Sequence, residues 1–239
     1  MEAFISDRII AIYCLCDDLL KALHHHKDPQ RQMSDAKVIT TAITAALFFH
    51  GNFETARAYL KDNGMIPSML SKSRFHRRLH RIRDLFLTLF STLGEIWKQL
   101  NADSIYIIDS FPIPVCDNYR IRRCRLYRSP EYRDYIASKR RYFYGLKIHV
   151  LATANGEPVE VFLTPGSASD VACLEGFQWD LPPGATVYVD RGYNDAAFEA
   201  VAAQDGEFAV QPMRQANMKN NFHPGFVICN KFIASGSRR

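Results

Sequence analysis

The chain has 239 residues, 47% of them hydrophobic and 23% charged, so it is long enough to bury a substantial core. No apolar run approaches the roughly 20 residues that cross a bilayer, and the N-terminus carries no secretory signal pattern. These features exclude a membrane span and predict a cytoplasmic protein. The six cysteines are scattered without a CxxC pair, which argues against a disulfide framework or a zinc site.

The first hundred residues predict helices, because their apolar residues recur at helical spacing. Ser34 is placed to cap the second helix, which Gly51 and Asn52 end. The expected helices cover residues 9–23, 35–50, 53–61 and 71–97. The last one carries a basic face, made of Arg74, Arg77, Arg78, Arg81 and Arg83. This face fits either a solvated helix or a helix-turn-helix-like DNA-binding module.

From about residue 104 the apolar pattern becomes that of β-strands. SIYIIDS predicts a buried strand ending at Asp109, and ATVYVDRGY predicts another ending at Asp190. Residues 140–164 predict two strands joined by a type I′ turn at Asn155-Gly156. A helix capped by Asp170 precedes the second buried strand; the alternative for Asp170 is a position near Asp109 and Asp190. A helix capped by Asn194 or Asp195, and then the strand EFAVQPM, follow it.

Asp109 and Asp190 each follow an almost continuously apolar run, which is typical of strands buried on both faces. Two such strands ending at the same sheet edge would place the carboxylates side by side, where a cation or a proton must offset their repulsion. Mg²⁺ prefers oxygen ligands and commonly binds through one or two carboxylates plus phosphates. We therefore expect a metal-binding, catalytic pair for phosphoryl transfer. The alternative is that each aspartate only caps a turn.

The segment 119–144 holds eight arginines and one lysine against two acids, so its net charge of +7 exceeds the +5 of the whole chain. Six tyrosines are interleaved with these cations. Arginine binds phosphate bidentately and tyrosine can stack on bases, so the segment predicts nucleic-acid contact close to the metals. A solvated loop is the alternative. The predicted nucleic-acid-binding residues are Arg120, Arg122, Arg123, Arg125, Arg128, Lys139, Arg140, Arg141 and Lys147. Lys147 shares a strand face with His149. Both side chains can either point toward the metals or have their hydrogen bonds satisfied by other groups on the sheet face.

Four segments together resemble the DDE transposases of bacterial insertion sequences: DSFPIPVCDN at 109–118, SKRRYFYGLKIHVL at 138–151, FLTPGSASD at 162–170 and VYVDRGYND at 187–195. The resemblance covers residues 34–214. It implies an α/β (α+β) fold, with a ribonuclease-H-like mixed sheet and flanking helices at 101–214. An all-helical, DNA-binding region at 1–100 would precede it, and an irregular tail at 215–239 would follow.

The resemblance implies that Asp109 and Asp190 are the first two acids of a three-acid centre that uses Mg²⁺ or Mn²⁺. The implied chemistry is strand cleavage at transposon ends, followed by attack of the freed 3′-hydroxyl on target DNA. The implied partner is double-stranded DNA, both terminal repeats and target, in a nucleoid-associated protein. The sequence leaves the oligomeric state open, a homodimer included.

The third acid of the family, a glutamate on a later helix, has no match, because the chain contains no Asp or Glu after Glu207. We therefore expect a truncation or frameshift near residues 215–225, and a chain that retains DNA binding with impaired catalysis. Two alternatives remain open. One is a ribonuclease-H-like nuclease with a different third ligand. The other is a non-catalytic DNA-binding protein that occupies transposon ends as an inhibitor.

Overall fold

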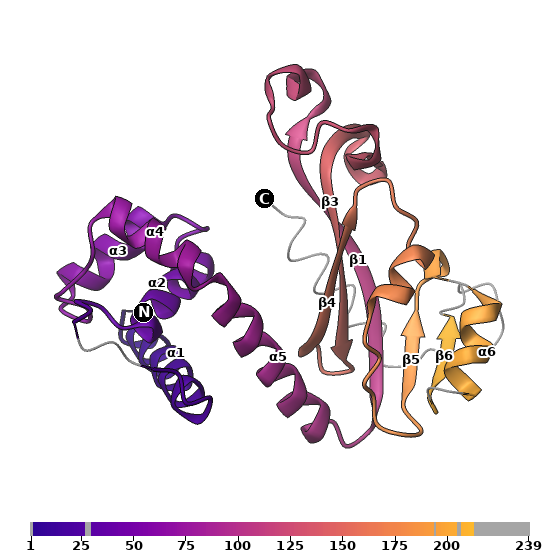
Figure 1. The fold of residues 1–239 in the computed structure, drawn as a ribbon, viewed down its shortest axis with the longest axis horizontal. Helices are drawn as coiled ribbons and strands as arrows, with labels where there is room; N and C mark the ends of the chain where they lie inside the picture. The colour runs from indigo at the N-terminus through magenta and orange to yellow at the C-terminus, as the bar shows by residue number, and fades with distance from the viewer. Residues whose placement is uncertain (1, 27–29, 194, 205–206, 213–239) are drawn as a thin grey trace. The chain divides into compact units, whose positions relative to one another are not determined.

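The computed structural model describes residues 2–26, 30–193, 195–204 and 207–212 (Figure 1). The chain divides into two compact units, Met1–Thr92 and Leu93–Arg239, each with its own buried apolar cluster. The division falls inside a helix, ahead of the predicted boundary at residue 100. Within the described ranges, none of the helices is both long and apolar enough to cross a bilayer.

The first unit is helical, as the sequence predicts. Its helices are α1 (Glu2–Ala22), α2 (Asp35–Phe48), α3 (Phe53–Asp62), α4 (Lys72–Arg81) and the start of α5 (Arg83–Leu100). The hydroxyl of Ser34 accepts a hydrogen bond from the Lys37 backbone N at 3.4 Å, which confirms the predicted cap of α2. The single helix predicted over 71–97 is wrong, because it breaks at Ile82. The apolar spacing continues across this break and hides it from the sequence.

Asp35 organises the first unit. Its buried carboxylate accepts hydrogen bonds from His25 at 2.9 Å, from Arg31 at 2.9 Å and from Arg78 at 2.7 and 2.9 Å. Burial by itself raises the pKa of Asp35, but the bonds from His25 and Arg78 and the charges of Arg78 and Arg31 outweigh it and hold that pKa below its ordinary value. Arg78 therefore joins α4 to α2, and it leaves the predicted basic face of α4 with fewer exposed cations.

The second unit is built on one mixed sheet (Figure 1). Its strands are β1 (Ile105–Asp117), β2 (Arg133–Ile136), β3 (Arg141–Thr153), β4 (Pro158–Pro165), β5 (Thr186–Val189) and β6 (Ala209–Pro212). Short helices connect them: η1 (Asn118–Arg123), η2 (Pro130–Tyr132), η3 (Ala137–Lys139), η4 (Val171–Gly176), η5 (Arg191–Tyr193) and α6 (Ala196–Gln204).

The strand order fixes the fold class. β3 pairs antiparallel with β1, β4 pairs antiparallel with β3, and β5 and β6 continue the sheet parallel to β1. Three antiparallel strands followed by two strands parallel to the first form the ribonuclease-H-like arrangement. The predicted fold, an α/β sheet preceded by a helical region, is thereby confirmed.

The hairpin between β3 and β4 is confirmed, but its predicted type I′ turn is wrong. That turn needs positive φ at both central residues. Among the four loop residues only Gly156 has it, with φ of 94°. The turn closes through a hydrogen bond from Gly156 N to Thr153 O at 2.9 Å.

One face of the sheet is buried. Tyr106 and Ile108 of β1, Leu151 of β3 and two valines of β5 pack with residues of η4 and α6 into a single cluster. Because strand side chains alternate, Ser110 shares this face with Ile108, while Asp109 points to the opposite one. The packed side chains of the buried face thus lie on the side of the sheet opposite the Asp109 carboxylate.

Candidate active site

The register between β1 and β5 brings Asp109 and Asp190 together. These strands are parallel, and their last aligned pair is Ile108 with Val189. Asp109 and Asp190 are the next residues on each strand, so they occupy equivalent positions on neighbouring strands, with backbones about 5 Å apart by sheet geometry. Asp190 directly follows the end of β5, as predicted. The backbone N of Tyr193 donates to its carbonyl oxygen at 3.0 Å and turns the chain into η5.

The prediction that the first strand ends at Asp109 is wrong. β1 continues for eight more residues, to Asp117, still paired with β3. β5 stops beside Ile108, so among the described residues no strand pairs with the other edge of this continuation. Pro112 and Pro114 fit there, because proline lacks a backbone N–H and is tolerated where no partner strand needs one. Asp109 therefore lies inside a long strand at the point where its parallel neighbour ends.

Tyr193 ties the segment after Asp190 to the strand that holds Asp109. Its hydroxyl lies 2.7 Å from Nδ1 of His149, and Nε2 of His149 lies 2.9 Å from the hydroxyl of Thr164. His149 is paired with Ser110, the neighbour of Asp109. Burial raises the pKa of Tyr193, and a hydrogen bond with Ser110 offsets part of that rise. Both aspartates thus have a near neighbour in the same buried network.

His149 is held neutral in this network. Its side chain is fully buried, and burial lowers its pKa to about 4. The sequence left two roles open for His149, facing the metals or having its hydrogen bonds satisfied on the sheet. The structure shows the second, because each ring nitrogen has a hydroxyl partner.

Asp170 connects three parts of the same region. Its Oδ1 accepts hydrogen bonds from the Ser110 hydroxyl at 3.2 Å and from the Lys147 ammonium at 3.1 Å. Its Oδ2 stands against the position of a Cβ on Gly192, so any other residue there would have to displace the Asp170 carboxylate from these bonds. Asp170 stands at the N-cap of η4, as predicted, but its carboxylate makes no capping bond to this helix. The sequence signal near it, GSASD, suggests a local turn and gives no sign of partners 23 and 60 residues away.

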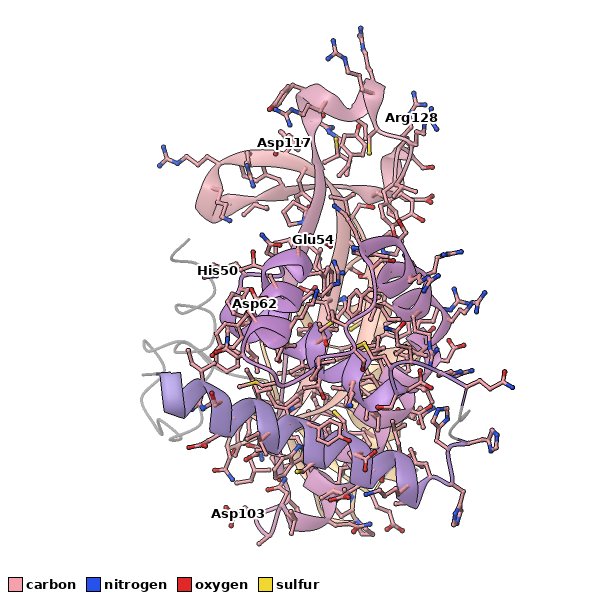
Figure 2. All side chains as sticks on the ribbon, turned by 90° about the vertical axis from the view of Figure 1, so that its left-hand side faces the viewer. His50, Glu54, Asp62, Asp103, Asp117 and Arg128 are labelled. Carbon is pink, nitrogen blue, oxygen red and sulfur yellow. The ribbon has the colours of Figure 1, made fainter. Side chains whose placement is uncertain are left out.

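The predicted nucleic-acid-binding residues fall into two groups. Lys147 is half-buried and also donates to the Ala168 carbonyl at 2.9 Å, so its ammonium is already engaged. The others are exposed and lie beyond the acidic site, on the far part of the β1–β3 hairpin. We call residues 113–146 the arm. Figure 2 shows Asp117 and Arg128 on it, among nitrogen-tipped side chains that point outward.

The two aspartates fit a hard divalent cation by donor chemistry, since adjacent carboxylates are the ligands that Mg²⁺ and Mn²⁺ accept. Within the described part of the chain, no group of three or more histidine, cysteine, aspartate or glutamate side chains is placed to hold a metal. These residues therefore offer a two-carboxylate site at most. The stretch at 215–225, where the third acid was expected to be missing, lies outside the described residues.

Comparisons with known proteins bear on this arrangement. A search of the solved structures finds a piggyBac transposase synaptic complex with hairpin DNA, at 13% identity and a TM-score of 0.35, covering 91% of this chain and 42% of that one. It also finds a Mos1 transposase paired-end complex with the left transposon end, at 14% identity and a TM-score of 0.30, covering 79% and 61%. The chain thus spans less than two thirds of either protein. Likeness at this level does not assign a function.

No curated protein matches the chain significantly in sequence. The profile of the family described as "Transposase DDE domain" matches residues 99–231, which is more than half of the 239 residues. The matched range holds both aspartates, the arm and the whole sheet. The chain belongs to the transposase DDE domain family.

Proposed function

We propose that this chain cleaves DNA phosphodiester bonds at a divalent metal held by Asp109 and Asp190, as the first step of transposition. The observation that carries the proposal is the parallel register of β1 and β5. It puts the two carboxylates at equivalent positions, next to the buried hydrogen-bond network of His149 and Tyr193. When bound, the metal would supply Lewis-acid stabilisation of charge on the phosphate oxygens. The chain's own contribution is to hold the two carboxylates in place.

The second candidate function is DNA binding without turnover. It is favoured by a specific observation, because the described residues offer two carboxylates and no third ligand. Two ligands hold Mg²⁺ weakly, since this ion keeps its water and usually adds substrate phosphates.

One experiment separates the two candidates. Supercoiled plasmid is incubated with the full chain in Mg²⁺ or Mn²⁺, beside the variants Asp109→Asn and Asp190→Asn. Metal-dependent nicking that both variants abolish supports cleavage. Salt-sensitive binding of the plasmid by all three proteins, with no product from any of them, supports the non-catalytic role. Nicking that both variants retain would remove the two aspartates from the mechanism.

A control substitution tests whether charge alone explains a loss of nicking. Asp103 is exposed, and it lies on the turn before β1 rather than at the β1–β5 junction. Asp103→Asn removes the same charge as the two test substitutions, so its nicking should equal that of the wild type.

A further inference from the structure

The arm concentrates the positive charge of the protein at one place. Between residues 113 and 146 it carries nine lysines and arginines against three acids, a net charge of +6, while the whole chain carries +5. All nine cations are exposed. Among the described residues, Arg141 pairs with Asp117 at 3.3 Å, and the other eight cations form no ion pair. A surface of this kind fits a polyanion and repels a second copy of itself.

Aromatic contacts pre-organise the arm. The guanidinium of Arg133 lies 4.2 Å from the ring centre of Tyr142, and that ring also packs against Tyr135 at 5.0 Å. Tyr127 packs against Tyr132 at 4.9 Å. These rings contact one another or a guanidinium, although Tyr135 and Tyr142 remain 45% and 47% exposed. The contacts order the surface around the nine cations, and those cations fit the phosphates of a DNA backbone.

The arm lies well away from the carboxylates. Along β1, eight residues separate Asp109 from Asp117, which at about 3.4 Å per residue is about 27 Å. Along the axis of duplex DNA each strand carries one phosphate every 3.4 Å or so, so a duplex lying along β1 covers about eight base pairs over this span. Figure 1 shows the hairpin continuing past β5 and β6 in this direction. The expectation that phosphate bound by these arginines would lie close to the metals therefore does not fit the length of the strand.

We propose that the arm binds the backbone of duplex DNA about eight base pairs away from the phosphodiester at Asp109 and Asp190. This inference rests on the proposed function, because it takes the carboxylate pair as the place where the reacting phosphate lies. The arm then sets how far the duplex must extend on one side of that phosphate. It plays no part in the chemistry itself.

The test maps both positions on one DNA. A 30-bp duplex carries three adjacent methylphosphonates at its centre, which remove the negative charge there. The full chain is loaded with Fe²⁺, and ascorbate with peroxide then generates hydroxyl radicals at the bound iron. The cuts mark where the carboxylate pair lies, whether or not the enzyme turns over.

The arm should avoid the uncharged methylphosphonates. The carboxylate pair is then placed less often about eight base pairs away from them, so that position should show fewer cuts. The variant Arg120→Ala/Arg122→Ala/Arg123→Ala should lose this displaced minimum. It should also bind an unmodified duplex at least tenfold more weakly at 100 mM salt, with a salt slope smaller by about two to three. The control Arg8→Ala/Lys21→Ala/Lys61→Ala removes equal charge from exposed positions outside both the arm and the predicted basic face of 74–83, and should keep the minimum.

The outcomes separate the two proposals. A minimum at the patch itself, or an identical pattern for wild type and the arm variant, would overturn the inference. Cuts that are absent, or unchanged in Asp109→Asn/Asp190→Asn, would instead count against the proposed metal site. In that case the tenfold binding difference still decides whether the arm contacts DNA.

Discussion

The two halves of the β1–β3 hairpin share one hydrogen-bonded ladder but present different chemistry. In the inner half, Ile108 and Leu151 are fully buried, and His149 has both ring nitrogens in hydrogen bonds. In the arm, the cations are exposed, and no described strand pairs with the outer edge of β1. The ladder fixes where each residue stands. Packing against η4 and α6 then determines whether a polar group is locked in place or available to a ligand.

The largest effect should come from Asp109, which lies between the two halves of the hairpin, and from Asp190 beside it. Asp109→Asn or Asp190→Asn should lower Mn²⁺ affinity at least 100-fold and reduce nicking below detection, because each removes half of the proposed ligand set. Electron paramagnetic resonance of Mn²⁺ measures the affinity. An Asp190→Asn protein that binds Mn²⁺ like the wild type would show that Asp109 and Asp190 do not form the metal site.

The second effect separates the halves by stability. His149→Ala should cost about 2–4 kcal/mol, because it leaves a cavity and removes a hydrogen-bond partner from both Tyr193 and Thr164. Arg128→Ala, at an exposed position of the arm, should change stability by less than about 0.5 kcal/mol. Urea denaturation compares the two variants. Similar losses of stability in the two variants would contradict the difference between the hydrogen-bonded inner half and the exposed arm.

The third effect is a pH dependence confined to the inner half. His149 has a pKa of about 4 when folded, against about 6.5 in the unfolded chain, so the unfolded state takes up its proton first as pH falls. Stability should therefore decrease from pH 6.5 to pH 4, by up to about 3 kcal/mol from this residue. Above pH 6.5 its contribution is constant. Urea titrations at each pH should show a shallower acid slope for His149→Gln, and an unchanged slope would refute the assignment.

The smallest effect tests whether the buried network positions the aspartates. Tyr193→Phe and Thr164→Val each remove one hydrogen bond to the His149 ring, and each should cost about 1 kcal/mol. Only Tyr193 is connected to the segment after Asp190. Tyr193→Phe alone should therefore weaken Mn²⁺ binding, by about tenfold. Equal Mn²⁺ affinities in the two variants would mean that the network supports the fold and nothing more.

The sequence predicted the inner half better than the arm. Two apolar runs, each ending in aspartate, sufficed to place Asp109 and Asp190 on adjacent buried strands, because an almost unbroken apolar run is typical of a buried strand. The course of β1 past Asp109 was missed, since Pro112 and Pro114 suggest a break when the open edge is unknown. The role of Asp170 was missed as well. Its partners Ser110 and Lys147 are distant along the chain, and only the folded sheet brings them to it.

The prolines of β1 have a consequence for how the protein behaves in concentrated solution. An unpaired strand edge can template another strand, which leads to aggregation. Beyond Asp109, the edge of β1 that no described strand covers carries Pro112 and Pro114, which cannot donate to an incoming strand, and it leads to a densely cationic tip. These prolines therefore oppose strand pairing along the edge beside the carboxylates, and they leave it available to a polyanion.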